Sequence, residues 1–142
     1  MHDALTESLA TGYALSSTVR GLVHELEDSD VIVHIVAATS RSGPPGSLQF
    51  ITRGGGFRFL RITVDATLSP RRRMALLAHE LQHAVEVARA SNVTDADSLA
   101  SLYRRIGWSV TGHASHYETA AAQRTGARVF AEVGEGRRTA TW

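Results

Sequence analysis

The sequence predicts an α+β fold for this chain of 142 residues. Two runs of strand-forming residues, 48–52 and 57–65, surround a glycine-rich turn, which is typical of a β-hairpin. A third apolar run, 31–37, has the β-branched composition of a strand. Apolar residues at three-to-four spacing predict helices before and after these runs. We therefore expect a short mixed β-sheet, hairpin included, packed on helices.

Length and composition limit the classes of protein that the chain can belong to. A chain of this length is most simply one domain over 1–142. Residues 1–13 are expected to form a loose terminus or an early helical turn, and 135–142 a loose tail. It has no cysteine, which excludes disulfides and thiolate metal sites. The net charge of +1 gives no reason to expect a nucleic-acid partner. The sequence does not indicate an oligomeric state.

The hydropathy pattern predicts a soluble protein without a membrane span. No apolar run approaches the ~20 residues that such a span requires, and no secretory signal is visible. All fifteen basic residues are arginines, which resembles the coding bias of a GC-rich genome. We expect a bacterial protein that is cytoplasmic or is secreted after processing, and the compartment stays open.

The first predicted elements lead up to the hairpin. Ser16 or Ser17 can cap a helix that ends in the acidic run 25–30. The run 31–37 predicts a largely buried strand. In the strand 57–65, alternate residues face opposite sides of the sheet. If this strand lies on the sheet edge, it can pair with an extended peptide substrate.

The helix after the hairpin carries the strongest chemical signal. Ser69 suits the N-cap and Pro70 the first helical position, while apolar residues recur through 74–88. His79 and His83 are four residues apart, so their imidazoles lie one turn apart on the same side and can bind one metal ion. The pattern H-E-x-x-H also occurs by chance on surface helices. The apolar surroundings argue against that alternative, since buried histidines need partners.

Two histidines are too few for a catalytic zinc site, which typically has three protein ligands. Glu118, near the start of the last predicted helix at 115–131, is our first candidate for the third ligand. The alternative is a helix cap, because Ser115 and Glu118 have the spacing of a capping box. Glu86 is the next candidate ligand, but its position favours orienting a ligand histidine or forming a salt bridge.

Glu80 is placed for proton transfer, because it is adjacent to one ligand and points away from the ligand axis. A carboxylate beside zinc can take a proton from water as that water attacks a carbonyl, and can pass it to a leaving amine. A group that stabilises the oxyanion is also expected. The sequence neighbours available for that role are Tyr117, His116, His113 and Tyr103, and the two histidines are also candidate ligands or exposed loop residues.

The segment His79-Glu80-Leu81-Gln82-His83, followed by Ala-Val-Glu, resembles the active-site helix of zincin metallopeptidases. With Glu118 as third ligand, the chain is similar to the gluzincin branch, and in particular to the small minigluzincins. The resemblance covers 48–133 and implies a substrate-binding edge strand, then the metal helix, then a glutamate helix. It implies a Zn²⁺-dependent peptidase acting on a peptide or protein, with Glu80 as general base and His79, His83 and Glu118 as ligands.

The chain departs from related patterns at two positions. Metzincins would continue with a glycine and a third histidine, whereas Ala84 follows His83. Several gluzincins place an aspartate four residues after the ligand glutamate to orient a histidine, and Ala122 stands there. The orienting group is therefore left open between Glu86, Asp65 and a backbone carbonyl.

Two further functions compete with hydrolysis. In a non-catalytic metal-binding or interaction module, zinc would only tie two helices together and Glu80 would be dispensable. In a non-haem iron enzyme, two histidines and a carboxylate would bind Fe(II). The adjacency of Glu80 and His79 favours zinc hydrolysis over both.

Overall fold

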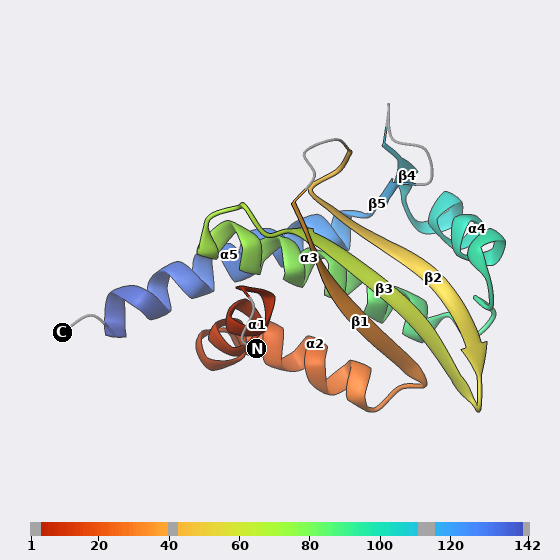
Figure 1. Cartoon of the computed structure of the whole chain (residues 1–142), viewed down its shortest axis with the longest axis horizontal. Helices are drawn as coiled ribbons and strands as arrows, with labels where there is room; N and C mark the ends of the chain where they lie inside the picture. The colour runs from red at the N-terminus through yellow and green to blue at the C-terminus, as the bar shows by residue number, and fades with distance from the viewer. Residues whose placement is uncertain (1–3, 40–42, 111–115, 141–142) are drawn as a thin grey trace.

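The computed structural model describes residues 4–39, 43–110 and 116–140, and the predicted α+β class is confirmed (Figure 1). Within these ranges the helices are α1 (Ala4–Leu15), α2 (Ser17–Glu27), α3 (Pro70–Arg89), α4 (Ala96–Ile106) and α5 (Ala120–Ala140). The strands are β1 (Val31–Ala38), β2 (Gly46–Gly54), β3 (Phe57–Asp65), β4 (Trp108–Ser109) and β5 (Tyr117–Glu118).

The main sheet has the order β1-β3-β2, with β1 parallel and β2 antiparallel to β3. The predicted hairpin is β2–β3, and its turn is Gly55-Gly56. Their φ angles of 62° and 85° belong to the left-handed region that glycine enters without a steric penalty. The register shifts between Phe50 and Thr52, so Ile51 forms an irregularity in β2.

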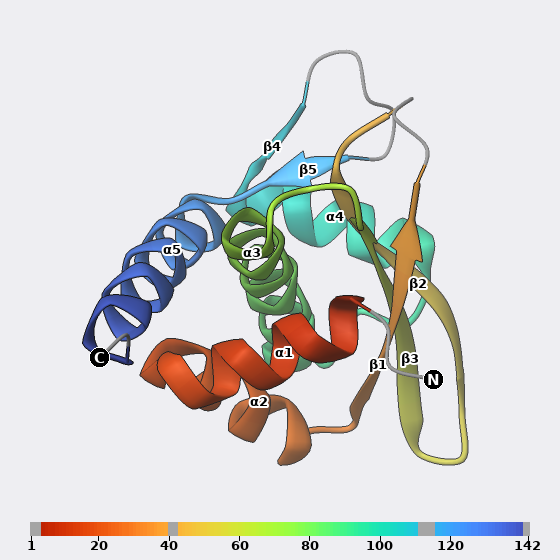
Figure 2. The same ribbon diagram turned by 60° about the vertical axis from the view of Figure 1, so that its left-hand side comes forward.

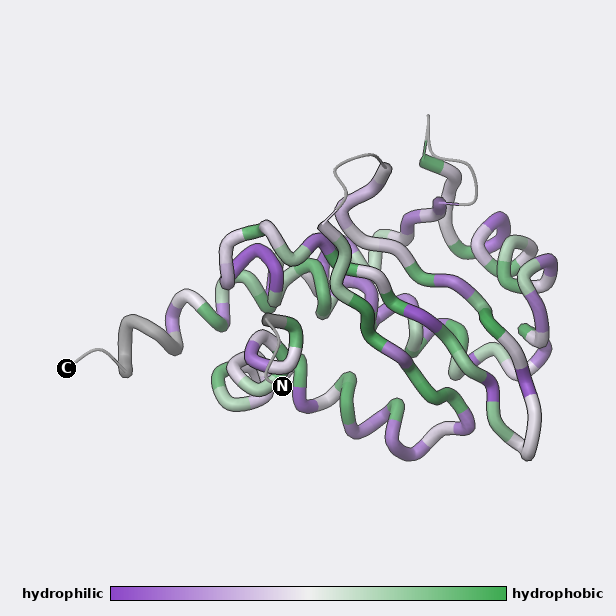
Figure 3. The backbone as a smooth tube through the Cα atoms, viewed as in Figure 1, coloured by the Kyte–Doolittle hydropathy of each residue, from purple (hydrophilic) through white to green (hydrophobic). Residues whose placement is uncertain are grey.

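Helix α3 covers one face of this sheet, and the main core lies between them (Figures 1 and 2). Leu60, Ile62 and Val64 of β3 are fully buried, as are Leu77 and Val85 of α3. Figure 3 shows β1 apolar along most of its length, whereas β3 changes repeatedly between apolar and polar residues. No helix of the described residues covers the other face, on which β1 and β3 still carry apolar side chains, among them Ile32 and Phe57.

The positions of two strands differ from the predictions. The strand at 31–37 is not largely buried, because β1 is an edge strand: Ile32 is 42% exposed and His34 is exposed. The strand at 57–65 is not at an edge, because β3 pairs on both sides. The edge strand of the hairpin is β2. A sequence pattern shows which face of a strand is apolar, whereas the order of strands depends on pairing between distant segments.

In the described residues, the N-terminal segment is helical, in line with the second alternative for 1–13, whereas the loose tail expected from residue 135 is not found. Residues 4–15 form α1, in which Leu5 is buried and Gly12 lies so close to Met74 of α3 that a Cβ at Gly12 would meet its sulfur. The segment 135–140 continues α5 instead of forming a tail. Helices α1 and α5 both pack on α3, and this packing stabilises helical structure in segments that would be marginal in isolation.

Within the described ranges, none of the helices combines the length and the apolar character that a membrane span requires.

Candidate metal centre

Helix α3 presents two histidines and a glutamate toward one point. It begins at Pro70, as predicted, although the side chain of Ser69 makes no capping hydrogen bond. A ring nitrogen of His79, a ring nitrogen of His83 and a carboxylate oxygen of Glu80 all lie within 4.8 Å of one another. His83 and Glu80 are buried, because α3 lies between the sheet and α5. These donors form a group that can hold a metal ion.

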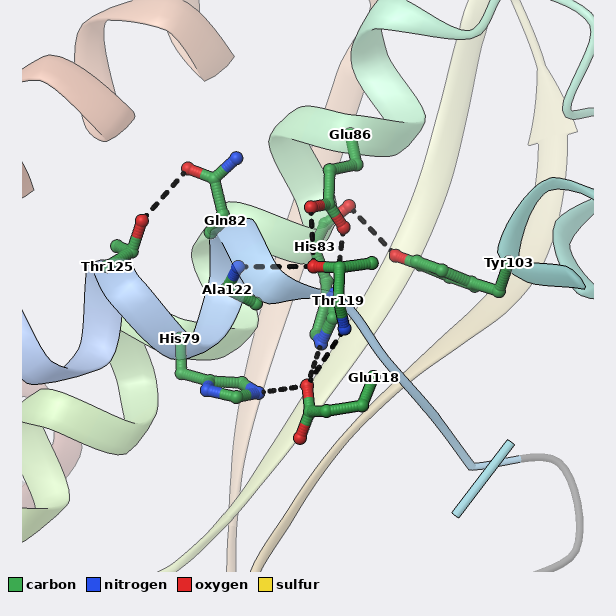
Figure 4. Close-up of polar contacts among 9 residues, drawn as sticks. All are labelled: His79, Gln82, His83, Glu86, Tyr103, Glu118, Thr119, Ala122 and Thr125. Carbon is green, nitrogen blue, oxygen red and sulfur yellow. Dashed lines mark hydrogen bonds and ion pairs between the residues drawn. The ribbon is translucent and has the colours of Figure 1, made fainter. Parts of the chain in front are cut away.

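Glu118 joins this group from a distant part of the chain (Figure 4). Its Oε1 lies 2.6 Å from Nε2 of His79 and 3.1 Å from Nε2 of His83. Two imidazole nitrogens thus converge on one carboxylate oxygen. Both Glu80 and Glu118 can supply the carboxylate of a two-histidine site, and we favour Glu118 because both Nε2 atoms contact it directly.

Glu118 does not lie on a helix as predicted. It belongs to β5, and α5 begins two residues later at Ala120. Thr119 caps this helix, since its Oγ1 accepts a hydrogen bond from the backbone N–H of Ala122. The carboxylate of Glu118 contacts the histidines, so the capping role does not account for it. Ser115, its expected capping partner, lies outside the described residues.

A short second sheet holds Glu118 in place. Strand β5 pairs with β4, with Trp108 opposite Glu118 and Ser109 opposite Tyr117. Gly107, the residue before β4, lies directly against β5: a Cβ at this position would come 2.0 Å from the backbone oxygen of Glu118. The position of Glu118 therefore depends on the end of α4 as well as on α5.

Glu86 orients His83. Its Oε1 lies 2.8 Å from Nδ1 of His83, which directs Nε2 toward the point of convergence. Its Oε2 accepts a hydrogen bond of 2.7 Å from the hydroxyl of Thr119. Sequence reasoning named Glu86 but missed Thr119. The signal that would have identified Thr119 is a threonine directly before an alanine-rich helix, a typical N-cap.

Helix α5 approaches α3 closely beside His79. A Cβ on Gly126 would lie 3.4 Å from Cβ of His79, so a small residue is needed there. Ala122, on the same helix, is fully buried. Gln82 accepts a hydrogen bond from Thr125 across the same interface (Figure 4).

The electrostatics of the site follow from this burial and these contacts. Burial raises the pKa of Glu80 to about 7, against the opposing effect of the two histidines. Burial alone would lower the pKa of His83, but hydrogen bonds to Glu118 and Glu86 raise it to about 9. The pKa of Glu118 falls to about 2, because the histidines outweigh its burial. A ligating histidine must be neutral, so a metal ion bound at this point would displace the proton that His83 carries at neutral pH.

A small cavity lies next to Glu80 and His83. Its volume is about 20 Å³, enough for one water molecule. Tyr103, His116 and Tyr117 line it, so three of the four residues considered for stabilising an oxyanion are beside the site. The hydroxyl of Tyr103 already donates to the backbone oxygen of His83. His113 lies outside the described residues.

Tyr103 reinforces the position of His83. Its ring packs edge-on against that imidazole, with centroids 5.2 Å apart, and stacks on Tyr117 at 5.7 Å. Asp65, considered as an orienting group, instead accepts hydrogen bonds from Thr67. Of the three options left open by the sequence, Glu86 is the one in contact with a histidine ring nitrogen.

Comparison with known protein families, with curated proteins and with solved structures finds no match for this chain. The site is therefore interpreted from its own chemistry.

Proposed function

We propose that the protein is a zinc-dependent metallopeptidase, with His79, His83 and Glu118 as ligands and Glu80 as general base. One observation carries the proposal: both Nε2 atoms converge on a single carboxylate oxygen while a second, buried carboxylate lies beside them. Two histidines and a glutamate are a donor set that suits catalytic zinc. Zinc in such a set acts as a Lewis acid, which acidifies water and polarises a carbonyl.

The roles of the side chains follow from their contacts. Glu80, with its pKa raised to about 7, is suited to accept a proton from the water that attacks the peptide carbonyl. It then delivers that proton to the amine as the C–N bond breaks. Glu86 holds His83 in the required orientation. His116 or Tyr117, which line the adjoining cavity, would stabilise the oxyanion.

The substrate would be an extended peptide lying along β2. This strand is at the edge of the sheet, and its first residue passes beside the site: a Cβ on Gly46 would lie 3.1 Å from Oε1 of Glu80. An open strand edge can hydrogen-bond a peptide backbone. Peptide binding, which the sequence suggested for the strand 57–65, is therefore proposed for β2.

Metal analysis of the purified protein and two variants tests the ligand assignment. We expect about one zinc per chain. Glu118→Ala should lose most of the zinc, whereas Glu80→Gln should retain it and lose peptide hydrolysis. Zinc lost in Glu80→Gln and kept in Glu118→Ala would make Glu80 the ligand and would contradict its role as base. Glu25→Ala, which removes an exposed carboxylate on α2, serves as the control for both measurements.

A non-catalytic metal-binding module is the second candidate, and the size of the cavity favours it. A space of about 20 Å³ admits a water molecule but not a peptide bond. In that case zinc would raise the melting temperature of the wild type and of Glu80→Gln equally, and no peptide would be cleaved. Cleavage by the wild type that disappears in Glu80→Gln would exclude this candidate.

A further inference from the structure

A groove separates the open edge of β2 from α4. Its volume is about 390 Å³, within the range of small-ligand sites, and its walls are mainly apolar. Residues 48–51 form one wall, Ala96, Leu99 and Ala100 form the other, and Tyr117 closes one end. Figures 1 and 2 both show α4 beside β2.

The three α4 residues belong to one face of that helix. Positions 96, 99 and 100 have the spacing that brings side chains together on one face. Leu99 is 8% exposed and forms the floor, while Ala96 is exposed and Ala100 half-buried. Because both alanines are small, they leave open the space that a larger residue on this face would fill.

The groove is continuous with the candidate metal centre. Leu48, Leu99 and Tyr117 line both the groove and the small cavity beside Glu80 and His83. The groove therefore adjoins the site. This continuity distinguishes it from the apolar groove between α1, α2 and β1, which has no lining residue in common with the site.

An extended peptide on β2 would use the groove in one particular way. Side chains of a strand alternate between the two sheet faces, so every second residue of the peptide would face α4. Leu48 and Phe50 of β2 face the core side, and Gln49 between them is exposed. A side chain of the peptide on the core side would enter the space over Leu99, and its neighbours would point to solvent.

We propose that this groove is a specificity pocket that selects a large apolar side chain, such as leucine or phenylalanine, at one position of an extended peptide. The inference rests on the proposed function, because it names the substrate class of the same site. The size of the pocket is set by Ala96 and Ala100. Apolar burial supplies the selectivity, and the edge of β2 supplies backbone hydrogen bonds that do not depend on sequence.

Binding of short fluorescent peptides to the Glu80→Gln variant tests the pocket without requiring hydrolysis. The peptides differ at one central position, which carries leucine, phenylalanine, serine or glutamate. We expect the apolar peptides to bind at least about tenfold more tightly than the polar ones. Adding Ala100→Trp should remove that difference by filling the groove. Ser101→Trp, on the exposed side of α4, should leave it unchanged.

Ala96→Trp also obstructs the groove. Because Ala96 is exposed, this substitution should disturb folding less than Ala100→Trp. Circular dichroism and zinc content establish that each variant is folded. Equal binding of apolar and polar peptides, or a preference that survives both tryptophans in folded protein, would overturn the inference.

The outcomes also separate this inference from the proposed function. If the wild type cleaves peptides and neither tryptophan changes the preferred side chain, the peptidase stands and the pocket is wrong. If apolar peptides bind and each tryptophan blocks them, but the wild type cleaves none, the pocket stands and the peptidase proposal fails.

Discussion

At the scale of single residues, Glu86 connects parts of the site that lie far apart in the sequence. One of its oxygens contacts His83 within α3, and the other accepts the hydroxyl of Thr119 before α5. Its side chain is 9% exposed, so these contacts are shielded from water. Glu86 thereby couples the orientation of a histidine to the start of the helix that follows Glu118.

Replacing Glu86 by alanine should weaken metal binding without removing a ligand. Loss of the partner that orients a ligating histidine typically lowers metal affinity about 10–100-fold. Competition with a chelator of known affinity would measure the change. Glu25→Ala is the matched control, since that carboxylate pairs with the exposed Arg89. Unchanged affinity in Glu86→Ala would mean that Tyr103 and packing alone position His83.

The carboxylate of Glu132 joins α5 to the start of α2. It accepts hydrogen bonds from the hydroxyls of Ser16 and Thr18 and from the backbone N–H of Thr18. Burial works to raise its pKa, but these bonds outweigh it, so its pKa lies below the ordinary value of 4.5. The stabilisation is thus present above about pH 4.5 and is lost as pH falls toward the lower, folded pKa.

Glu132→Gln should therefore destabilise the protein more at neutral than at acid pH. We expect its free energy of unfolding to lie below that of the wild type near pH 7, with the difference shrinking as pH falls below about 4.5. Urea unfolding at several pH values gives both curves. A difference that is constant over the whole range would show that Glu132 does not titrate in the folding equilibrium.

At the scale of elements, Arg58 fixes the end of the metal helix. Its guanidinium donates to the backbone oxygens of Val87, Ala88, Ala90 and Val93, and it forms a bidentate pair with Asp30. Arg58 is 5% exposed. It binds carbonyls in the last turn of α3 and in the segment that follows, two of which (Val87 and Ala90) also accept a backbone N–H, and it joins α3 to β3.

Arg58→Met should destabilise the protein. It removes the side-chain donor of the Ala88 and Val93 carbonyls, and leaving a buried acceptor without its donor costs about 1–3 kcal/mol. The carboxylate of Asp30, which is 44% exposed, would be solvated. Chemical denaturation of both proteins measures the loss. Arg89→Met removes an exposed arginine on the last turn of α3 and should cost about 1 kcal/mol or less. Similar losses in the two variants would contradict the capping role of Arg58.

At the scale of the whole molecule, the position of Glu118 relative to the histidines depends on the elements that connect them along the chain. The chain leaves α3, passes through α4 and turns at Gly107 into β4, and β5 then returns Glu118 to the histidines. Because β4 and β5 are two residues each, small displacements at their ends move Glu118. The distance between α4 and β2 also sets the width of the groove.

Gly107→Ala should therefore reduce metal affinity although residue 107 contacts no histidine. A Cβ there would lie 2.0 Å from the backbone oxygen of Glu118, and backbone has to move to relieve the contact. We expect weaker zinc binding in the same chelator competition, together with a lower melting temperature.

Gly21→Ala is the matched control, because a Cβ at that position of α2 meets nothing within 4 Å. It should stabilise the helix by about 0.5–1 kcal/mol and leave zinc binding unchanged. Wild-type zinc affinity in Gly107→Ala would show that Glu118 adapts to the displaced turn.

The sequence by itself determined the local features of this protein. The spacing of His79 and His83, the buried side of α3, the hairpin at Gly55-Gly56 and the α+β class all follow from periodicities and turn residues within a few positions of one another. The sequence also named Glu118 as a candidate ligand, from its separation of 35 residues from His83 and its place near a predicted helix, and its carboxylate contacts both histidines.

Only the tertiary structure decided how these parts meet. Because β1 pairs with β3, β3 is the central strand and β2 lies at an edge of the sheet. The β4–β5 pair places Glu118 before a helix instead of on it. Arg58 likewise binds backbone oxygens 29 and 35 positions away in the sequence, at Val87 and Val93. Thr119 binds Glu86, 33 positions away. Such contacts depend on the burial and pairing of the folded chain as a whole, for which no local pattern in the sequence is sufficient.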